Sequence, residues 1–126
     1  MANTVAIYYT DEFGEWFAAL SALEQTVVIN VVTKLQLRGL ALGAPHSSAL
    51  AGTSIALREL RPNRGHSPLR VVYAFDPTRD AVLILGGDKS GGSPQQFYVG
   101  LLAQAEIIWA QYLTERHPGV IKEEQP

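Results

Sequence analysis

The stretch LRVVYAFDPTRDAVLIL, residues 69–85, decides the fold of this chain. Residues 69–75 alternate between the two faces of a predicted strand. Leu69, Val71, Tyr73 and Phe75 share one face, and Arg70, Val72 and Ala74 share the other. The DPTRD segment is a tight connection, and residues 81–85 are apolar on both faces, as is typical of a central strand. The stretch therefore predicts two neighbouring antiparallel strands inside a sheet.

Two more strands are expected to extend this pair. Residues 5–9 (VAIYY) are β-branched and aromatic, and residues 54–61 form a further apolar run with imperfect alternation. Residues 44–53 are expected to form a loop, and the Pro- and Gly-containing residues 62–68 a turn. The three strands from residue 54 onward are joined by short connections, which predicts an antiparallel meander.

Two helices are predicted between the first and second strands. Thr10 followed by two acids is typical of a helix start, and this helix is expected over residues 11–20. The capping box SALE (residues 21–24) starts a second amphipathic helix, which Gly39 or Gly43 ends. Because almost no linker separates the two helices, we expect them to form a helical hairpin.

A third helix follows the glycine-rich loop GGDKSGG (residues 86–92). The motif SPQQ, with Pro94 at the first helical position, is typical of a helix start, and the helix is expected to reach about Glu115. The order β-α-α-β-β-β-α predicts an α+β fold with the helices packed on one face of an antiparallel sheet. Residues 1–116 are expected to form a single domain, and residues 117–126 a flexible C-terminal tail.

Composition excludes several classes of protein. The chain has 126 residues, of which 47% are hydrophobic and 17% charged, so it can build a core and is not wholly disordered. It has no cysteine, which excludes disulfide scaffolds and thiolate metal sites. No signal peptide or membrane-spanning stretch is recognisable, so we expect a cytoplasmic protein without membrane contact. The net charge of -2 argues against a strongly basic nucleic-acid binder.

Motifs for nucleotide or metal chemistry are also absent from the sequence. Lys89 and Ser90 follow glycines, but Asp88 occupies the place of the second P-loop glycine. The three histidines have no metal-ligand spacing, so no cofactor or metal is expected.

Local charge is more informative than the total. Arg58, Arg61, Arg64 and Arg70, together with His66, make one segment basic. Arginine forks match phosphate oxygens, although loop arginines are often only solvated. An arginine in mid-strand needs either a carboxylate partner, such as Glu59, or a polyanionic ligand. With Lys89 in the glycine-rich loop and Tyr98 in the next helix, Arg61 and Arg70 are predicted to surround one concave sheet face.

The same stretches resemble a known family. The ordered set LRELR (57–61), LRVVYAF (69–75) and LILGGDKSG (83–91), followed by Phe97-Tyr98, resembles the RelE/ParE superfamily of type II toxin–antitoxin toxins. The HigB-like, phage-derived branch is the most similar. This resemblance implies a RelE-like fold and a metal-free mRNA endonuclease that acts on the ribosome. In that reaction the ribose 2′-OH attacks the adjacent phosphate. It also implies a cognate antitoxin, a helix-turn-helix protein, as partner.

Carried over by position, the resemblance assigns roles to individual residues. Arg70 corresponds to the arginine that stabilises the phosphate, Lys89 to a proton donor or phosphate clamp, and Tyr98 to an aromatic that stacks on a base or orients the phosphate. Arg61 is the fourth expected catalytic residue. RNA binding is expected of Arg58, Arg64 and His66. For the general base, Arg61, His66, Glu59 and Lys89 all remain candidates.

Two alternatives stay open from the sequence. The first is a non-enzymatic toxin of the ParE kind, which would inhibit DNA gyrase by binding it. The second is a catalytically attenuated homologue that acts only as a binding partner, which the net negative charge favours.

Overall fold

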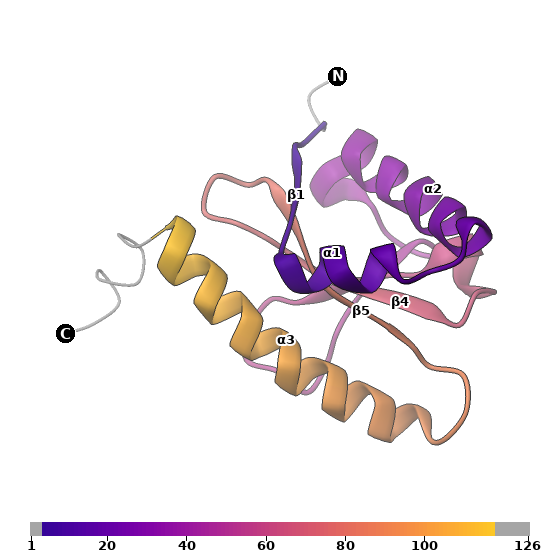
Figure 1. Ribbon diagram of the computed structural model, residues 1–126. Coiled ribbons are helices and arrows are strands. Elements are labelled where there is room, and N and C mark those ends of the chain that lie inside the picture. The colour runs from indigo at the N-terminus through magenta and orange to yellow at the C-terminus, as the bar shows by residue number, and fades with distance from the viewer. Residues whose placement is uncertain (1–3, 118–126) are drawn as a thin grey trace.

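The sheet has five strands and lies between helices (Figure 1). The computed structural model describes residues 4–117. The strand order is β1-β5-β4-β3-β2. The strands are β1 (Ile7–Tyr9), β2 (Ser47–Ala49), β3 (Arg58–Leu60), β4 (Leu69–Phe75) and β5 (Ala81–Asp88). The predicted α+β class is confirmed, since helices precede and follow this sheet.

The predicted pairing of residues 69–75 with the next strand is confirmed. β4 and β5 are antiparallel, with Phe75 opposite Ala81 and Leu69 opposite Asp88, and an irregularity in register at Val72/Tyr73. β5 is three residues longer than expected, because it includes the first part of the predicted glycine-rich loop. Gly86 and Gly87 belong to this extension, and their bare backbone lies against Trp16 and Phe97.

Two features of the sheet differ from the sequence-based prediction. The sheet is mixed rather than antiparallel, because β1 pairs with β5 in parallel. The expected loop over residues 44–53 contains the edge strand β2, and the expected strand over residues 54–61 is only three residues long in β3. β2 pairs with β3, and its small polar sequence SSA does not reveal this pairing.

The three α-helices begin at the predicted caps. α1 (Asp11–Ala18) has Thr10 as N-cap, and α2 (Ala22–Arg38) has the complete capping box of Ser21 and Glu24. α3 (Pro94–Arg116) starts after Ser93, whose side chain accepts from the backbone of Gln96. Two short 3-10 helices, η1 (Gly39–Ala41) and η2 (Pro62–Gly65), follow α2 and β3.

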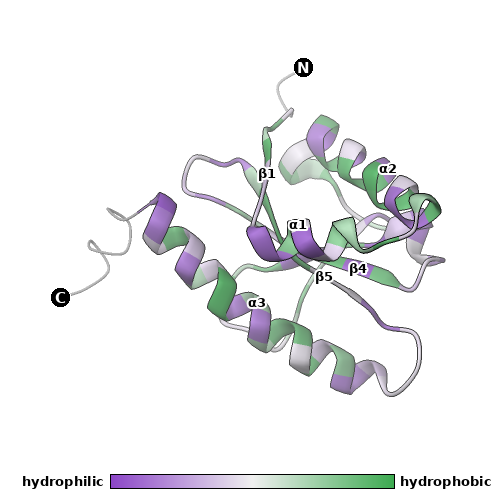
Figure 2. Cartoon of the chain, in the orientation of Figure 1, coloured by the Kyte–Doolittle hydropathy of each residue, from purple (hydrophilic) through white to green (hydrophobic). Residues whose placement is uncertain are grey.

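The prediction that the helices cover one face of the sheet is wrong. α1 and α2 pack on one face, in a core that includes Phe13, Leu35 and Tyr73. α3 packs on the other face, in a second core that includes Val72 and Trp109. Figure 2 shows the corresponding alternation of hydrophobic and hydrophilic residues along α3. The alternation of β4 therefore sends its two sets of side chains into two different cores.

The ends of the chain limit two further expectations. Apart from His117, the expected tail over residues 117–126 lies outside the described residues, and the division of the chain at residue 116 stays a prediction. Within residues 4–117, no helix is both long and apolar enough to cross a membrane.

Candidate active site

Glu59 is the centre of a polar cluster between the sheet and α3. It lies on β3, and only 3% of its surface is exposed. Its Oε1 accepts a hydrogen bond from the Tyr98 hydroxyl at 2.7 Å. Its Oε2 accepts from Ser48 Oγ at 3.1 Å and from Arg61 Nη1 at 3.0 Å. A buried carboxylate needs such donors, because burial without them strongly disfavours its charge.

Arg70 lies beneath this carboxylate with its side chain 1% exposed. Its Nη1 donates to the backbone oxygens of Ser67 and Leu69, both at 2.7 Å. Its Nε is 3.7 Å from Glu59 Oε1 and has no hydrogen-bond partner. Of the two reasons considered for an arginine in mid-strand, the structure thus provides the carboxylate partner. The predicted projection of Arg70 from the face opposite Leu69 is confirmed, but the guanidinium is covered rather than open to solvent.

Tyr98 covers the cluster from near the start of α3. Neighbouring Phe97 packs edge-on against its ring and reaches the bare backbone of Gly87 on β5, where an added Cβ would lie 3.0 Å from the Phe97 ring. Burial, and then the hydrogen bond to the Glu59 carboxylate, raise the pKa of Tyr98 above its ordinary value of 10.0, although Arg70 opposes this shift. The phenol is therefore protonated at neutral pH and donates to Glu59.

Arg61 and Arg58 lie on opposite sides of the sheet. Arg61 joins the Glu59 cluster and keeps 33% of its side chain exposed. The side chain of Arg58 instead extends towards the α1–α2 face, where its Nε donates to Ser47 Oγ and the Tyr73 hydroxyl at 3.2 Å each. The expected grouping of basic residues is thus divided by the alternation of β3.

The other expected residues lie around this end of the sheet without joining the cluster. Lys89 directly follows β5, and its backbone N–H donates to Pro68 O at 3.0 Å. No hydrogen bond or ion pair of the Lys89 side chain occurs within the described part of the chain. Arg64 lies in η2 and His66 directly follows it, and both residues are exposed.

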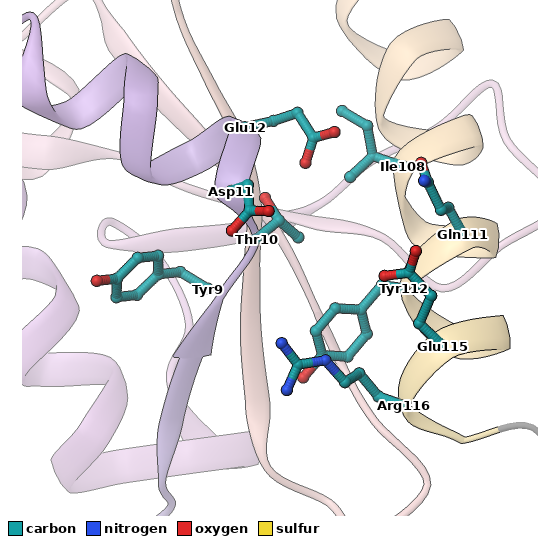
Figure 3. Close-up of a pocket in the computed structure, with 9 residues that line it drawn as sticks. All are labelled: Tyr9, Thr10, Asp11, Glu12, Ile108, Gln111, Tyr112, Glu115 and Arg116. Atoms are coloured by element: carbon teal, nitrogen blue, oxygen red, sulfur yellow. The ribbon is translucent and has the colours of Figure 1, made fainter.

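A separate pocket lies between the start of α1 and the end of α3 (Figure 3). Its acidic lining includes Asp11, Glu12 and Glu115, with Arg116 stacked over the Tyr112 ring. None of the predicted site residues lines it, and its carboxylates do not suit a phosphate. Over residues 4–117, no group of three or more metal-ligating side chains is placed to hold an ion.

The comparison with protein families agrees with this geometry. Residues 15–109 match the family described as "Phage derived protein Gp49-like". The chain belongs to this family. The matched region extends from α1 to Trp109 on α3, so it includes every residue of the Glu59 cluster.

Two relatives of this Gp49-like protein come from Mycobacterium tuberculosis (strain ATCC 25618 / H37Rv). "Putative toxin HigB3" is 29% identical over 116 residues, which cover 91% of this chain and 99% of the relative. "Putative toxin HigB2" is 29% identical over 107 residues, which cover 83% of this chain but 53% of the relative. The chain thus spans about half of the length of that second protein. The expected similarity to HigB-like toxins is confirmed.

Ser48 is the member of the cluster that sequence reasoning missed in this Gp49-like chain. It was expected in a loop, yet β2 pairs it directly with Glu59. Glu59 itself was expected only as a carboxylate partner of Arg70 or as one candidate base, not as the centre. The sequence did contain a signal for this arrangement. Side chains alternate along a strand, so Glu59 shares a face with Arg61 and lies on the face opposite Arg58.

Proposed function

We propose that this Gp49-like protein is the toxin of a type II toxin–antitoxin module and acts as a ribosome-dependent mRNA endonuclease. One observation carries the catalytic part: the hydroxyl of the half-buried Tyr98 donates to a buried carboxylate at 2.7 Å, and two guanidiniums flank that carboxylate. The attack of a 2′-OH on a phosphate needs a proton acceptor and nearby cations, and a carboxylate that acts through a phenol beside guanidiniums can supply both.

The proton transfers balance without a metal. As the 2′-oxygen forms its bond to phosphorus, its proton passes to the Tyr98 oxygen while Tyr98 gives its own proton to Glu59. The bond from phosphorus to the 5′-oxygen breaks, and the leaving oxygen takes a proton from Lys89. The products are a 2′,3′-cyclic phosphate and a 5′-hydroxyl. Arg61, which keeps part of its side chain exposed, contacts the phosphate directly in this proposal.

Arg70 has a different role in this proposal. Its guanidinium is buried and bonded to backbone carbonyls, so it supports the Glu59 carboxylate electrostatically rather than contacting the phosphate. The exposed residues Arg64 and His66, and Arg58 on the other face, are proposed to contact RNA. A cognate antitoxin, which we propose is a helix-turn-helix protein, would neutralise the toxin.

The burial of Arg70 also favours a second candidate. Because Glu59 partly neutralises Arg61 and Arg70, and the chain carries a net charge of -2, these two arginines attract an RNA phosphate less strongly than unpaired arginines would. A binding protein without nuclease activity, either a gyrase inhibitor of the ParE kind or an attenuated homologue, would need no free phosphate contact at Arg70.

Short induction in a bacterial host, followed by mapping of mRNA 5′ ends, separates these functions. The test variant is Tyr98→Phe, and the matched control is Tyr112→Phe on the same helix. We expect new 5′ ends inside translated reading frames with the wild type and the control. With Tyr98→Phe they should fall by about 10²- to 10⁴-fold, the range for loss of a general acid–base group.

Other outcomes would overturn the proposal. Growth arrest without cleavage would favour the gyrase-type toxin, and neither arrest nor cleavage from folded protein would favour the attenuated homologue. Equal cleavage by wild type and Tyr98→Phe would remove Tyr98 from the mechanism.

A further inference from the structure

A basic cleft, separate from the Glu59 cluster, lies on the side of the sheet that α2 covers. It has a volume of about 310 Å³ and lies between α2 and η2. Lys34 and Asn30 come from α2, His46 precedes β2, and Asn63 and Arg64 come from η2. These five side chains offer nitrogen donors from different elements around one space, and within residues 4–117 no carboxylate lines it.

Within residues 4–117, the cations of this cleft have no acidic partners. No ion pair among the described residues involves Lys34 or Arg64. Burial, and then the charges of Lys34, Arg38 and Arg64, lower the pKa of His46 below its ordinary value of 6.5. Positive charges thus surround His46 with no carboxylate lining the cleft, in contrast to the Glu59 cluster, where a carboxylate compensates the arginines.

The backbone holds Arg64 in place over this cleft. Asn63 and Arg64 both have left-handed conformations, with φ of 54° and 57°. Such a conformation is uncommon for arginine and persists only where surrounding bonds fix it. Here the N–H of Arg61 donates to His46 O at 2.8 Å, and the N–H of His66 donates to Asn63 O at 2.9 Å. The turn thus directs a cation towards α2.

We infer that the cleft formed by Lys34, His46 and Arg64 binds a phosphate group of a single-stranded nucleic-acid backbone. Donors from several directions suit the oxygens of a tetrahedral phosphate better than those of a planar carboxylate, which one arginine fork satisfies. That the nucleic acid is RNA rests on the proposed function.

The cleft and the Glu59 cluster are joined by one turn. Arg61 belongs to the cluster and Arg64 to the cleft, and η2 lies between β3 and β4. A strand with one phosphate next to Arg61 can therefore cross η2 and place another phosphate in the cleft. The cleft would position RNA without taking part in the cleavage step.

The test is direct binding, independent of cleavage. The probes are inorganic phosphate, a single-stranded deoxyribonucleotide oligomer that lacks the 2′-OH, and a poly-glutamate peptide. NMR follows the His46 ring and the backbone amides of residues 63–65. The test variant is Lys34→Gln/Arg64→Asn, since asparagine tolerates the left-handed backbone. The matched control is Arg79→Gln/Arg116→Gln, which removes two positive charges elsewhere. Thermal melting checks that both variants are folded.

We expect phosphate and the oligomer to shift the His46 and residue 63–65 signals, and both to raise the His46 titration midpoint. The test variant should bind the oligomer about tenfold more weakly, as for loss of one charge-assisted contact. In a plot of log affinity against log salt concentration, the slope for the test variant should be smaller in magnitude by about 0.7, the value for one single-strand phosphate. The control should match the wild type.

Three results would overturn this inference. Shifts with phosphate alone would reduce the cleft to an adventitious ion site. Tighter binding of poly-glutamate than of the oligomer would assign the cleft to an acidic protein. If the salt dependence of binding is the same in the test variant as in the wild type, the cleft does not bind nucleic acid. Because the oligomer cannot be cleaved, a failure of the proposed nuclease activity leaves these outcomes unaffected.

Discussion

Tyr98 and Glu59 are 39 residues apart in the chain, and their side chains meet at 2.7 Å over the buried guanidinium of Arg70. Arg70 Nε lies 3.7 Å from the same oxygen, Glu59 Oε1, and has no hydrogen-bond partner. One carboxylate oxygen thus has a short bond to the phenol and a longer electrostatic contact with the arginine.

The buried pair of Glu59 and Arg70 should be strongly coupled. Glu59→Gln and Arg70→Met each leave a buried charge without its partner, which typically costs about 3–5 kcal/mol. We expect the double variant to lose clearly less stability than the sum of the two single variants, measured by urea unfolding. Additive losses would show that the pair does not interact.

Arg61 should matter for activity more than for stability. Its bond to Glu59 is partly exposed, and such ion pairs contribute about 0–1 kcal/mol. Under the proposed function, Arg61→Gln should lower mRNA cleavage by about 10²-fold, as for loss of one donor to a developing anion. Pulsed expression with 5′-end mapping measures this. Arg79→Gln is the matched control, and a similar decrease in both variants would contradict a specific role.

The stability of the protein should fall at high pH partly through Tyr98. Its folded-state pKa is raised above 10.0, so the folded state holds the phenol proton more tightly than the unfolded chain. This contribution is complete below pH 10 and is lost as pH rises through the folded-state pKa. Urea unfolding between pH 9 and pH 11 should therefore show a less steep decline for Tyr98→Phe. Parallel curves would rule out this contribution.

Two glycines should respond oppositely to alanine. A Cβ on Gly86 would overlap the indole of Trp16, so Gly86→Ala should destabilise the fold by about 1–3 kcal/mol. Gly100 lies within α3 with no neighbour near an added Cβ, so Gly100→Ala should stabilise the fold by about 0.5–1 kcal/mol. Urea unfolding of both variants measures the direction of each change in stability, and destabilisation by Gly100→Ala would contradict this prediction.

Local patterns predicted much of the fold. The capping residues before α1, α2 and α3 and the alternation of β4 are short-range signals, and the structure confirms them. Such short-range signals do not predict how segments that are distant in the chain pair with one another. The parallel contact of β1 with β5 and the edge strand β2 depend on backbone bonds whose partners no local pattern specifies.

The candidate site was predictable to a similar extent. The alternation of β4 placed Arg70 on the correct face and suggested Glu59 as its partner. It could not show that the guanidinium is covered, because α3 packs on that face rather than with α1 and α2. The cleft around Lys34 and His46 also escaped prediction, since it combines α2, residue 46 and η2, three segments distant in the chain.

The three-residue strand β3 makes the chain intolerant of length changes at one point. Arg58 and Glu59 are consecutive, and each serves a different face of the sheet. Side chains alternate between the two faces of a strand with a period of two. One residue inserted or deleted within the strand would therefore move Arg58 to the face of Glu59 and Glu59 to the face of Arg58. Arg70 would then meet a second cation in a buried site. Relatives with an insertion near this strand should therefore carry it between β2 and residue 57, and none within residues 58–60.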